Sequence, residues 1–203
     1  APAGVTASWI SRDHTLFGSA GLPEDRVTAA AWGAASQAYL ISIEPEFAGE
    51  AIRLNLRGTD ASASALHLVV HAGKFADATV VIDHTGQAVL GENIEIIADD
   101  EAKLKVVSVQ DWTRDSVHVS AQYAKIGRNA NFEHVVVTLG GDTVHITPTV
   151  DFAAPGGSVN LLGAYFATAG QHQEHRPFVD HSQPNCKSNV TYKGALQGEK
   201  AHT

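Results

Sequence analysis

The densest group of side chains able to do chemistry lies in residues 170–181, which read GQHQEHRPFVDH. This stretch contains three histidines and two carboxylates, and both side-chain types are common zinc ligands. The spacing argues against a metal site, because in an extended chain His172 and His175 point to opposite faces. On a helix they would share one side, but Pro177 and the neighbouring alternation disfavour a helix. A small histidine-rich metal-binding protein centred on His172 and His175 is therefore an alternative interpretation.

A second group surrounds Cys186, the single cysteine of the chain. Lys187 follows it directly, and a nearby cation can lower a thiol pKa, so that the thiolate acts as a nucleophile, sulfur carrier or metal ligand. His181 can assist if the turn at residues 184–185 folds it back. We name Cys186 and His181 as candidate metal ligands. The competing interpretation is that a lone cysteine is a small buried hydrophobe.

Motifs for catalysis or nucleotide binding are missing from the sequence. There is no G-x-S-x-G nucleophile elbow, no phosphate-binding G-x-x-x-x-G-K-[ST] loop and no dinucleotide G-x-G-x-x-G motif after a strand. We therefore assign no catalytic and no cofactor-binding residue. Six further histidines lie in or beside alternating runs, where we expect ordinary hydrogen-bonded positions on a sheet: His67, His71, His84, His118, His134 and His145.

A carbohydrate-active β-helix enzyme is a second alternative, because such enzymes use paired carboxylates along a groove. The candidates would be Asp83, Asp99, Asp100 and Asp180.

The elements that would position these groups are short strands separated by regular turns. From residue 51 onward apolar and polar residues alternate, as in Ile52, Leu54 and Leu56, which is the strand period. Turn signals at Gly127, Gly140, Gly156, Gly170 and Pro184 follow one another after 13, 16, 14 and 14 residues. This interval is half of a solenoid coil of roughly 20–30 residues. The pattern favours an all-β fold, a parallel β-helix, over a sandwich or closed barrel, which also have short, evenly spaced strands.

The first 50 residues follow a different pattern. Residues 1–24 are polar and irregular, and an alanine-rich stretch after Glu24 and Asp25 predicts a short helix, since acidic residues favour a helix start. The run Ile41-Ser42-Ile43 reads equally well as a first strand. We therefore expect an irregular and short helical segment over residues 1–50, followed by a β-helix core over residues 51–203.

Composition narrows the classes of protein. Apolar residues make up 44% of the 203 residues and charged residues 18%, with a net charge of −8. No basic stripe is available for a phosphate backbone, so nucleic acid is not expected as a partner. No apolar run reaches the roughly 18 residues of a membrane span, and the amino end lacks the pattern of a secretory signal. The simplest expectation is a cytoplasmic protein.

Three segments resemble the SufB/SufD family of iron–sulfur cluster assembly proteins. Residues 103–112 are similar to a strand with a Q-x-W ending, here Gln110 and Trp112. Residues 170–173 are similar to a Gly-Gln-His-Gln step, and residues 180–194 to a later rung of the same family. The sequence of the last segment is most similar to that of the actinobacterial SufD branch. The resemblance is good over residues 100–203, weaker over residues 25–100, and absent before them.

This resemblance implies a right-handed parallel β-helix and a non-catalytic scaffold subunit of a SufBCD-type complex. The implied partners are a SufB-like subunit and a SufC-like ABC ATPase. Members of the family continue with further coils and a helical end, so we expect a carboxy-terminally truncated chain that binds no cofactor itself. An iron–sulfur cluster is expected only in the full complex. An open β-helix end also predicts a homo-oligomer, because free strand edges seek partners.

Overall fold

The computed structural model describes residues 2–203, so Ala1, the first residue of the expected amino-terminal segment, lies outside the described part. The elements in chain order are β1 (Val5–Ser11), α1 (Arg26–Ala34), β2 (Gln37–Ile43), β3 (Ile52–Ala72), β4 (Asp77–Ala98), β5 (Lys103–Trp112), β6 (Val117–Ile126), β7 (Asn131–Thr138), β8 (Thr143–Phe152), β9 (Ser158–Thr168), β10 (His172–His175), β11 (Phe178–Asp180) and β12 (Lys187–Gln197).

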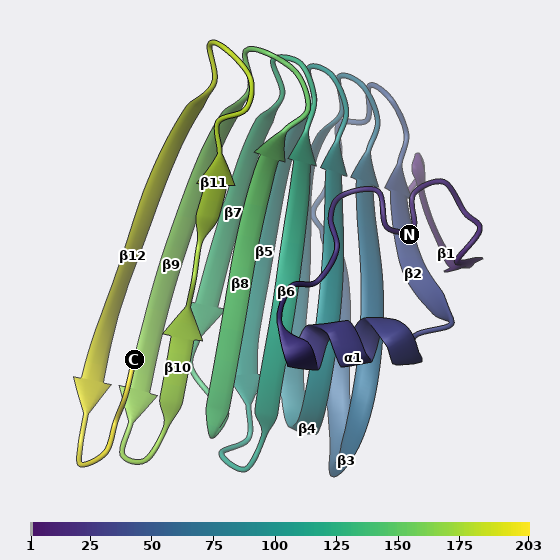
Figure 1. Ribbon diagram of the computed structural model, residues 1–203. Coiled ribbons are helices and arrows are strands. Elements are labelled where there is room, and N and C mark those ends of the chain that lie inside the picture. Colours follow the sequence, from purple (N-terminus) through teal and green to yellow (C-terminus); the bar gives the residue numbers. More distant parts are fainter. Residues whose placement is uncertain (1) are drawn as a thin grey trace.

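The strands form a parallel β-solenoid of about six turns, as the turn spacing predicts (Figure 1). Ile52 pairs with Val80 and Asn131 pairs with Ser158, so each chain segment hydrogen-bonds to the one a full coil later. Parallel pairing excludes the sandwich and barrel built from antiparallel hairpins. The exception is β1, which runs antiparallel to β2.

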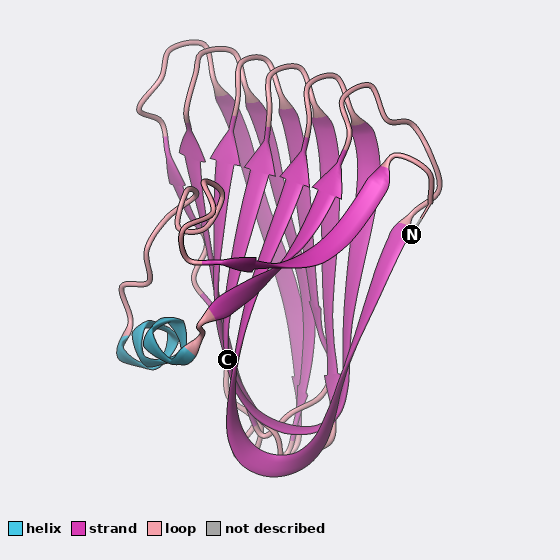
Figure 2. Cartoon of the chain, turned by 90° about the vertical axis from the view of Figure 1, so that its right-hand side faces the viewer, coloured by secondary structure: helices cyan, strands magenta, loops and turns pink. Residues whose placement is uncertain are grey.

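The solenoid has two walls that face each other across its interior (Figure 2). One wall contains the first halves of β3 and β4, followed by β5, β7, β9 and β12. The other contains β2, the second halves of β3 and β4, then β6, β8 and the β10–β11 pair. The long strand β4 passes from one wall to the other at Gly86, whose φ of 81° favours glycine.

The turns at the other edge of the walls repeat one backbone feature. Positive φ angles occur at the equivalent position of successive coils: Glu46, Phe75, Glu101, Asn129, Gly156 and Asn185. A left-handed residue in each coil reverses the chain in the same way, so the turns stack. The predicted turns at residues 156 and 184–185 are therefore confirmed, and Gly141 and Gly170 belong to the opposite set of turns, each with positive φ.

Inward side chains of successive coils stack into an apolar core. In β8 every second residue is buried, and Val80, Val106 and Leu161 are completely buried. Stacked aliphatic rows remove apolar surface from water at about 25 cal/mol per Å². This burial is what drives consecutive coils together.

The amino-terminal segment covers the outer surface of the second wall. Helix α1 lies across β3, β4 and β6 (Figure 1). Its N-cap is Asp25, whose carboxylate accepts from the backbone N–H groups of Val27 and Thr28, both at 2.9 Å. The predicted short helix is confirmed. The irregular prediction for residues 1–24 is wrong over Val5–Ser11, which form β1 because pairing with β2 satisfies their backbone groups. No helix within residues 2–203 is long and apolar enough to span a bilayer.

Candidate functional site

A fully buried cluster of charged and polar side chains lies between the two walls. Glu92 and His84 belong to β4, on opposite sides of its bend, and His118 belongs to β6; all three side chains have no exposed surface. Glu92 Oε1 lies 3.0 Å from His84 Nε2, and Glu92 Oε2 lies 3.1 Å from His118 Nε2. Ser120 also donates to Oε2, at 2.8 Å. The Glu92 carboxylate thus has partners on both oxygens.

The partners of the two imidazoles define where the protons lie. The indole N–H of Trp112 donates to His118 Nδ1 over 3.1 Å, so the proton of a neutral His118 is on Nε2 and is donated to Glu92. His84 Nδ1 lies 2.9 Å from the carbonyl oxygen of Val109, and its Nε2 faces a carboxylate. Both of these partners only accept, so His84 carries two protons and is an imidazolium.

The electrostatics of the cluster agree with this assignment. Burial opposes the charged form of His84, yet the neighbouring Glu92 carboxylate raises the pKa of His84 above its ordinary value. Burial also opposes ionisation of Glu92, but His84 and His118 hold the pKa of Glu92 far below its ordinary range. Burial and then the charge of His84 lower the pKa of His118. The cluster is a buried ion pair with one neutral imidazole.

The same three residues form a possible metal-ligand set, since their ligand atoms all lie within 4.8 Å of one another. Two histidines and a glutamate are a known zinc combination. To bind an ion through Nε2, however, a neutral His118 must carry its proton on Nδ1, where it would face the N–H of Trp112. Indole nitrogen only donates. The hydrogen-bond partners of the cluster therefore fit histidines that are protonated on Nε2 better than they fit a metal ion bound there.

A second polar row runs from this region toward β12. Thr138 Oγ1 donates to Gln110 Oε1 over 3.1 Å and lies 2.9 Å from His175 Nε2. The His175 ring stacks on Tyr165, with centroids 5.1 Å apart, and lies near Tyr192. Burial lowers the pKa of His175 to about 4 and raises that of Tyr192 to about 12. These rings line a cavity of about 320 Å³, where His175 Nδ1 and the Tyr192 hydroxyl have no partner within the described residues.

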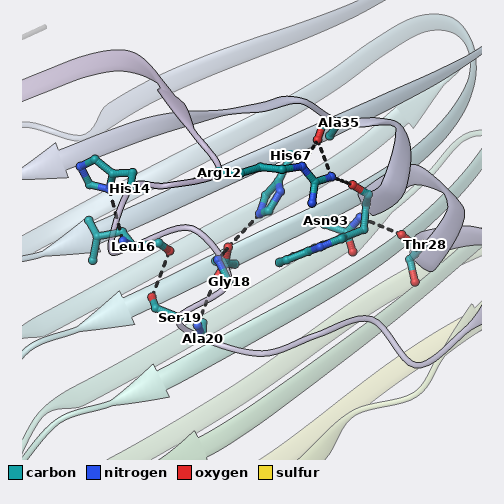
Figure 3. A network of polar contacts seen from close by, with 12 residues as sticks. Arg12, His14, Leu16, Gly18, Ser19, Ala20, Thr28, Ala35, His67 and Asn93 are labelled. Carbon is teal, nitrogen blue, oxygen red and sulfur yellow. Dashed lines mark hydrogen bonds and ion pairs between the residues drawn. The ribbon is translucent and has the colours of Figure 1, made fainter.

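A third buried pair, Glu95 and His67, holds the amino-terminal segment against the outer surface of the second wall. Figure 3 shows His67 beside this segment. Glu95 accepts hydrogen bonds from the backbone N–H groups of Gly18 at 2.7 Å and Ala20 at 2.8 Å, and lies 2.8 Å from His67 Nε2. The His67 ring packs between Phe17 and Trp32, at 4.3 and 4.4 Å between centroids. This pair positions α1 and its preceding loop.

The two candidate ligands from the sequence make separate contacts. His181 Nε2 lies 2.8 Å from Ser188 Oγ, whereas the half-buried Cys186 Sγ lies 3.7 Å from the carbonyl oxygen of Ala154. A metal role for Cys186 and His181 stays a prediction. His172 and His175 point to opposite faces, as the strand period indicates: His172 is exposed and His175 lines the interior.

The carboxylates of the carbohydrate hypothesis are dispersed over the surface. Asp83 pairs with Arg53 at 3.8 Å on one wall, and Asp100 pairs with Lys74 at 3.4 Å in a turn. Asp99 lies 3.1 Å from His71 Nε2, and Asp180 ends β11 on the other wall. This dispersion disfavours a paired-carboxylate groove.

The buried cluster is not predicted from the sequence. The sequence predicts ordinary hydrogen-bonded sheet positions for His84 and His118, and no motif singles out Glu92. One signal was present: Glu92 has the same strand parity as Ile94 and Ile96, which are inward and buried. A carboxylate on the apolar face of a strand needs a partner, because an isolated buried charge is very costly.

The fold and the cluster define a class of protein. It is a β-solenoid whose two walls face each other, and the charged side chains in its interior hydrogen-bond to one another. Comparison with known proteins gives the family. The model for "SUF system FeS cluster assembly, SufBD core domain" matches residues 54–203, and the chain belongs to this SufBD family.

Several similar curated proteins come from mycobacteria. Iron–sulfur cluster assembly SufBD family proteins of Mycobacterium bovis and Mycobacterium leprae are 43% and 42% identical over 200 and 198 residues. These alignments include 98% and 97% of this chain but 50% of each relative. A second family member of Mycobacterium leprae is 24% identical over 105 residues. The chain thus spans about half the length of the relatives that are 43% and 42% identical.

Proposed function

We propose that this chain is the β-helical part of a SufD-type scaffold subunit, which works in the cytoplasm within a SufBCD-type complex that assembles iron–sulfur clusters. Its expected partners are a SufB-like subunit and a SufC-like ABC ATPase. The observation that carries the proposal is the SufBD core match over residues 54–203. The similarity of residues 180–194 to the SufD branch favours SufD over SufB.

The chemistry of the interior supports a scaffold rather than an enzyme. Glu92, the carboxylate of the central cluster, is fully engaged by His84, His118 and Ser120. A general acid or base needs a substrate proton within hydrogen-bond reach, and the Glu92 side chain has no exposed surface. We infer that the cluster fastens the two walls to each other.

Co-purification tests the proposed complex. The full-length parent protein, carrying an affinity tag, is expressed with the SufB-like and SufC-like subunits of the same organism. Recovery of both subunits in fixed ratio is expected, and recovery of neither would refute the assignment. The present chain alone is expected to hold no stoichiometric cluster after anaerobic reconstitution with iron and sulfide, as measured by its absorption spectrum and iron content.

A further inference from the structure

We propose that the outer surface of the second wall binds a divalent transition-metal ion, such as Zn²⁺, between His145, His172 and Glu174. This site is independent of the scaffold role. It also differs from a His172–His175 pair, because the two histidines of that pair lie on opposite faces of the wall.

The strand register brings the three side chains together. Glu174 of β10 pairs with His145 of β8, so these residues are neighbours on adjacent rungs. His172 and Glu174 are two residues apart on β10 and therefore point to the same face. The three side chains are 23%, 49% and 30% exposed for His145, His172 and Glu174, so an ion can reach them from solvent.

The two imidazoles converge on one carboxylate oxygen without bonding to it. Glu174 Oε2 lies 3.9 Å from His145 Nδ1 and 3.7 Å from His172 Nε2, both beyond hydrogen-bond length. Ligand atoms around a tetrahedral zinc ion with bonds of 2.0–2.2 Å are about 3.4 Å apart. Each imidazole therefore needs only a short movement toward Glu174. The two imidazoles lie farther from each other, since His84, Glu92 and His118 are the group of the described residues whose ligand atoms already lie within 4.8 Å of one another. Binding an ion therefore also requires the His145 and His172 rings to rotate toward each other.

Neighbouring groups already orient the ligands. Thr147 Oγ1 lies 3.2 Å from His145 Nε2, which directs the other ring nitrogen, Nδ1, toward Glu174, as outer-shell partners do in metal sites. Arg176 pairs with Glu174 Oε1, leaving Oε2 for the ion.

A further imidazole lies near the proposed site on the next rung. His202 pairs with His172 through the backbone, and the two ring centroids are 6.3 Å apart. The positive charge of Arg176 opposes a second cation nearby, so we expect modest affinity. The donor set of imidazoles and one carboxylate suits Zn²⁺ and its neighbours in the first transition row.

Titration of the purified chain with Zn²⁺ by isothermal calorimetry tests the site, and the visible spectrum of bound Co²⁺ reports tetrahedral coordination. One saturable ion per chain is expected. His145→Ala, His172→Ala and Glu174→Gln should each weaken binding at least tenfold. All three positions are on the surface, and circular dichroism verifies that the variants fold.

Two matched controls remove a histidine elsewhere. His14→Ala changes an exposed residue of the amino-terminal segment, and His181→Ala changes the sequence-predicted ligand near Cys186; neither should alter the affinity. The proposal fails if the wild-type chain shows no saturable binding, if His172→Ala and Glu174→Gln bind as tightly as wild type, or if only His181→Ala loses the ion.

Discussion

Trp112 donates its indole N–H to Nδ1 of His118 over 3.1 Å, deep between the two walls of the solenoid. Because indole can only donate, this bond places the His118 proton on Nε2, where it meets Glu92. Both His118 nitrogens are then engaged, and the positive charge that balances Glu92 lies on His84. One neutral donor thus sets the protonation pattern of a buried ion pair.

Glu92→Gln should strongly destabilise the fold, because it leaves the His84 imidazolium buried without its counter-charge. Breaking one side of a buried ion pair costs about 3–5 kcal/mol. Urea denaturation at pH 6 measures the loss. The matched control is Glu133→Gln, which removes a partly exposed carboxylate paired with Lys105 at 2.7 Å and should cost less than about 1 kcal/mol. Equal effects of the two substitutions would contradict a structural role for the cluster.

The stability difference between wild type and Glu92→Gln should depend on pH. The pKa of Glu92 is lowered from 4.5, so its contribution is lost as pH falls below that value. The pKa of His84 is raised from 6.5, so its contribution is lost as pH rises above that value. The difference in unfolding free energy should therefore be largest between pH 4.5 and 6.5. A difference that grows steadily toward pH 9 would count against the imidazolium assignment.

His134→Leu should stabilise the protein, most clearly in acid. His134 follows Val106 in an inward apolar row, its Nε2 atom has no partner within the described residues, and burial lowers its pKa to about 4. Below pH 6.5 His134 is therefore protonated in the unfolded chain but stays neutral in the folded chain. The free energy of unfolding falls as the pH decreases toward 4. Leucine removes this loss. Denaturation at pH 7 and pH 5 should show a larger gain at pH 5, whereas His14→Ala should show none.

Two glycines near α1 should respond oppositely to alanine. A methyl group on Gly91 would lie 2.8 Å from the Cβ atom of Ala31, whereas one on Gly33 meets nothing within 4 Å. Gly91→Ala should therefore push α1 from the wall and lower the melting temperature. Gly33→Ala should raise helix stability by about 0.5–1 kcal/mol. Thermal unfolding of both variants measures these effects. A destabilised Gly33→Ala variant would contradict the open space beside Gly33 in α1.

The edge of β12 that has no strand partner within the described residues should make this chain self-associate. β12 pairs with β9 on one side, and Val190 and Leu196 are 46% and 48% exposed, although their counterparts one coil earlier, Leu161 and Ala167, are completely buried. Light scattering at rising concentration should detect oligomers. Leu196→Lys should reduce them, while Leu22→Lys, at an exposed position of the amino-terminal segment, should not. A monomer at high concentration would argue against this edge as a contact surface.

Local sequence patterns were enough to predict the architecture and the direction of individual side chains. Alternation from residue 51 and turns about half a coil apart indicate the solenoid, because each strand must bury one face and each coil must reverse twice. The same parity predicts that His172 and His175 diverge. The strand β1 was missed because Val5–Ser11 has little apolar alternation and is stabilised by pairing with β2.

The tertiary structure alone decided which inward residues meet across the interior. His84 and Glu92 are eight positions apart on β4 and come together because the strand bends at Gly86. His118 joins them because β6 pairs with β4 in a register that sets it beside Leu90 and Ser120 beside Glu92. Parity along a strand is a local property. Which residues of the two walls meet depends on how all the coils pack together, and no short stretch of sequence determines this.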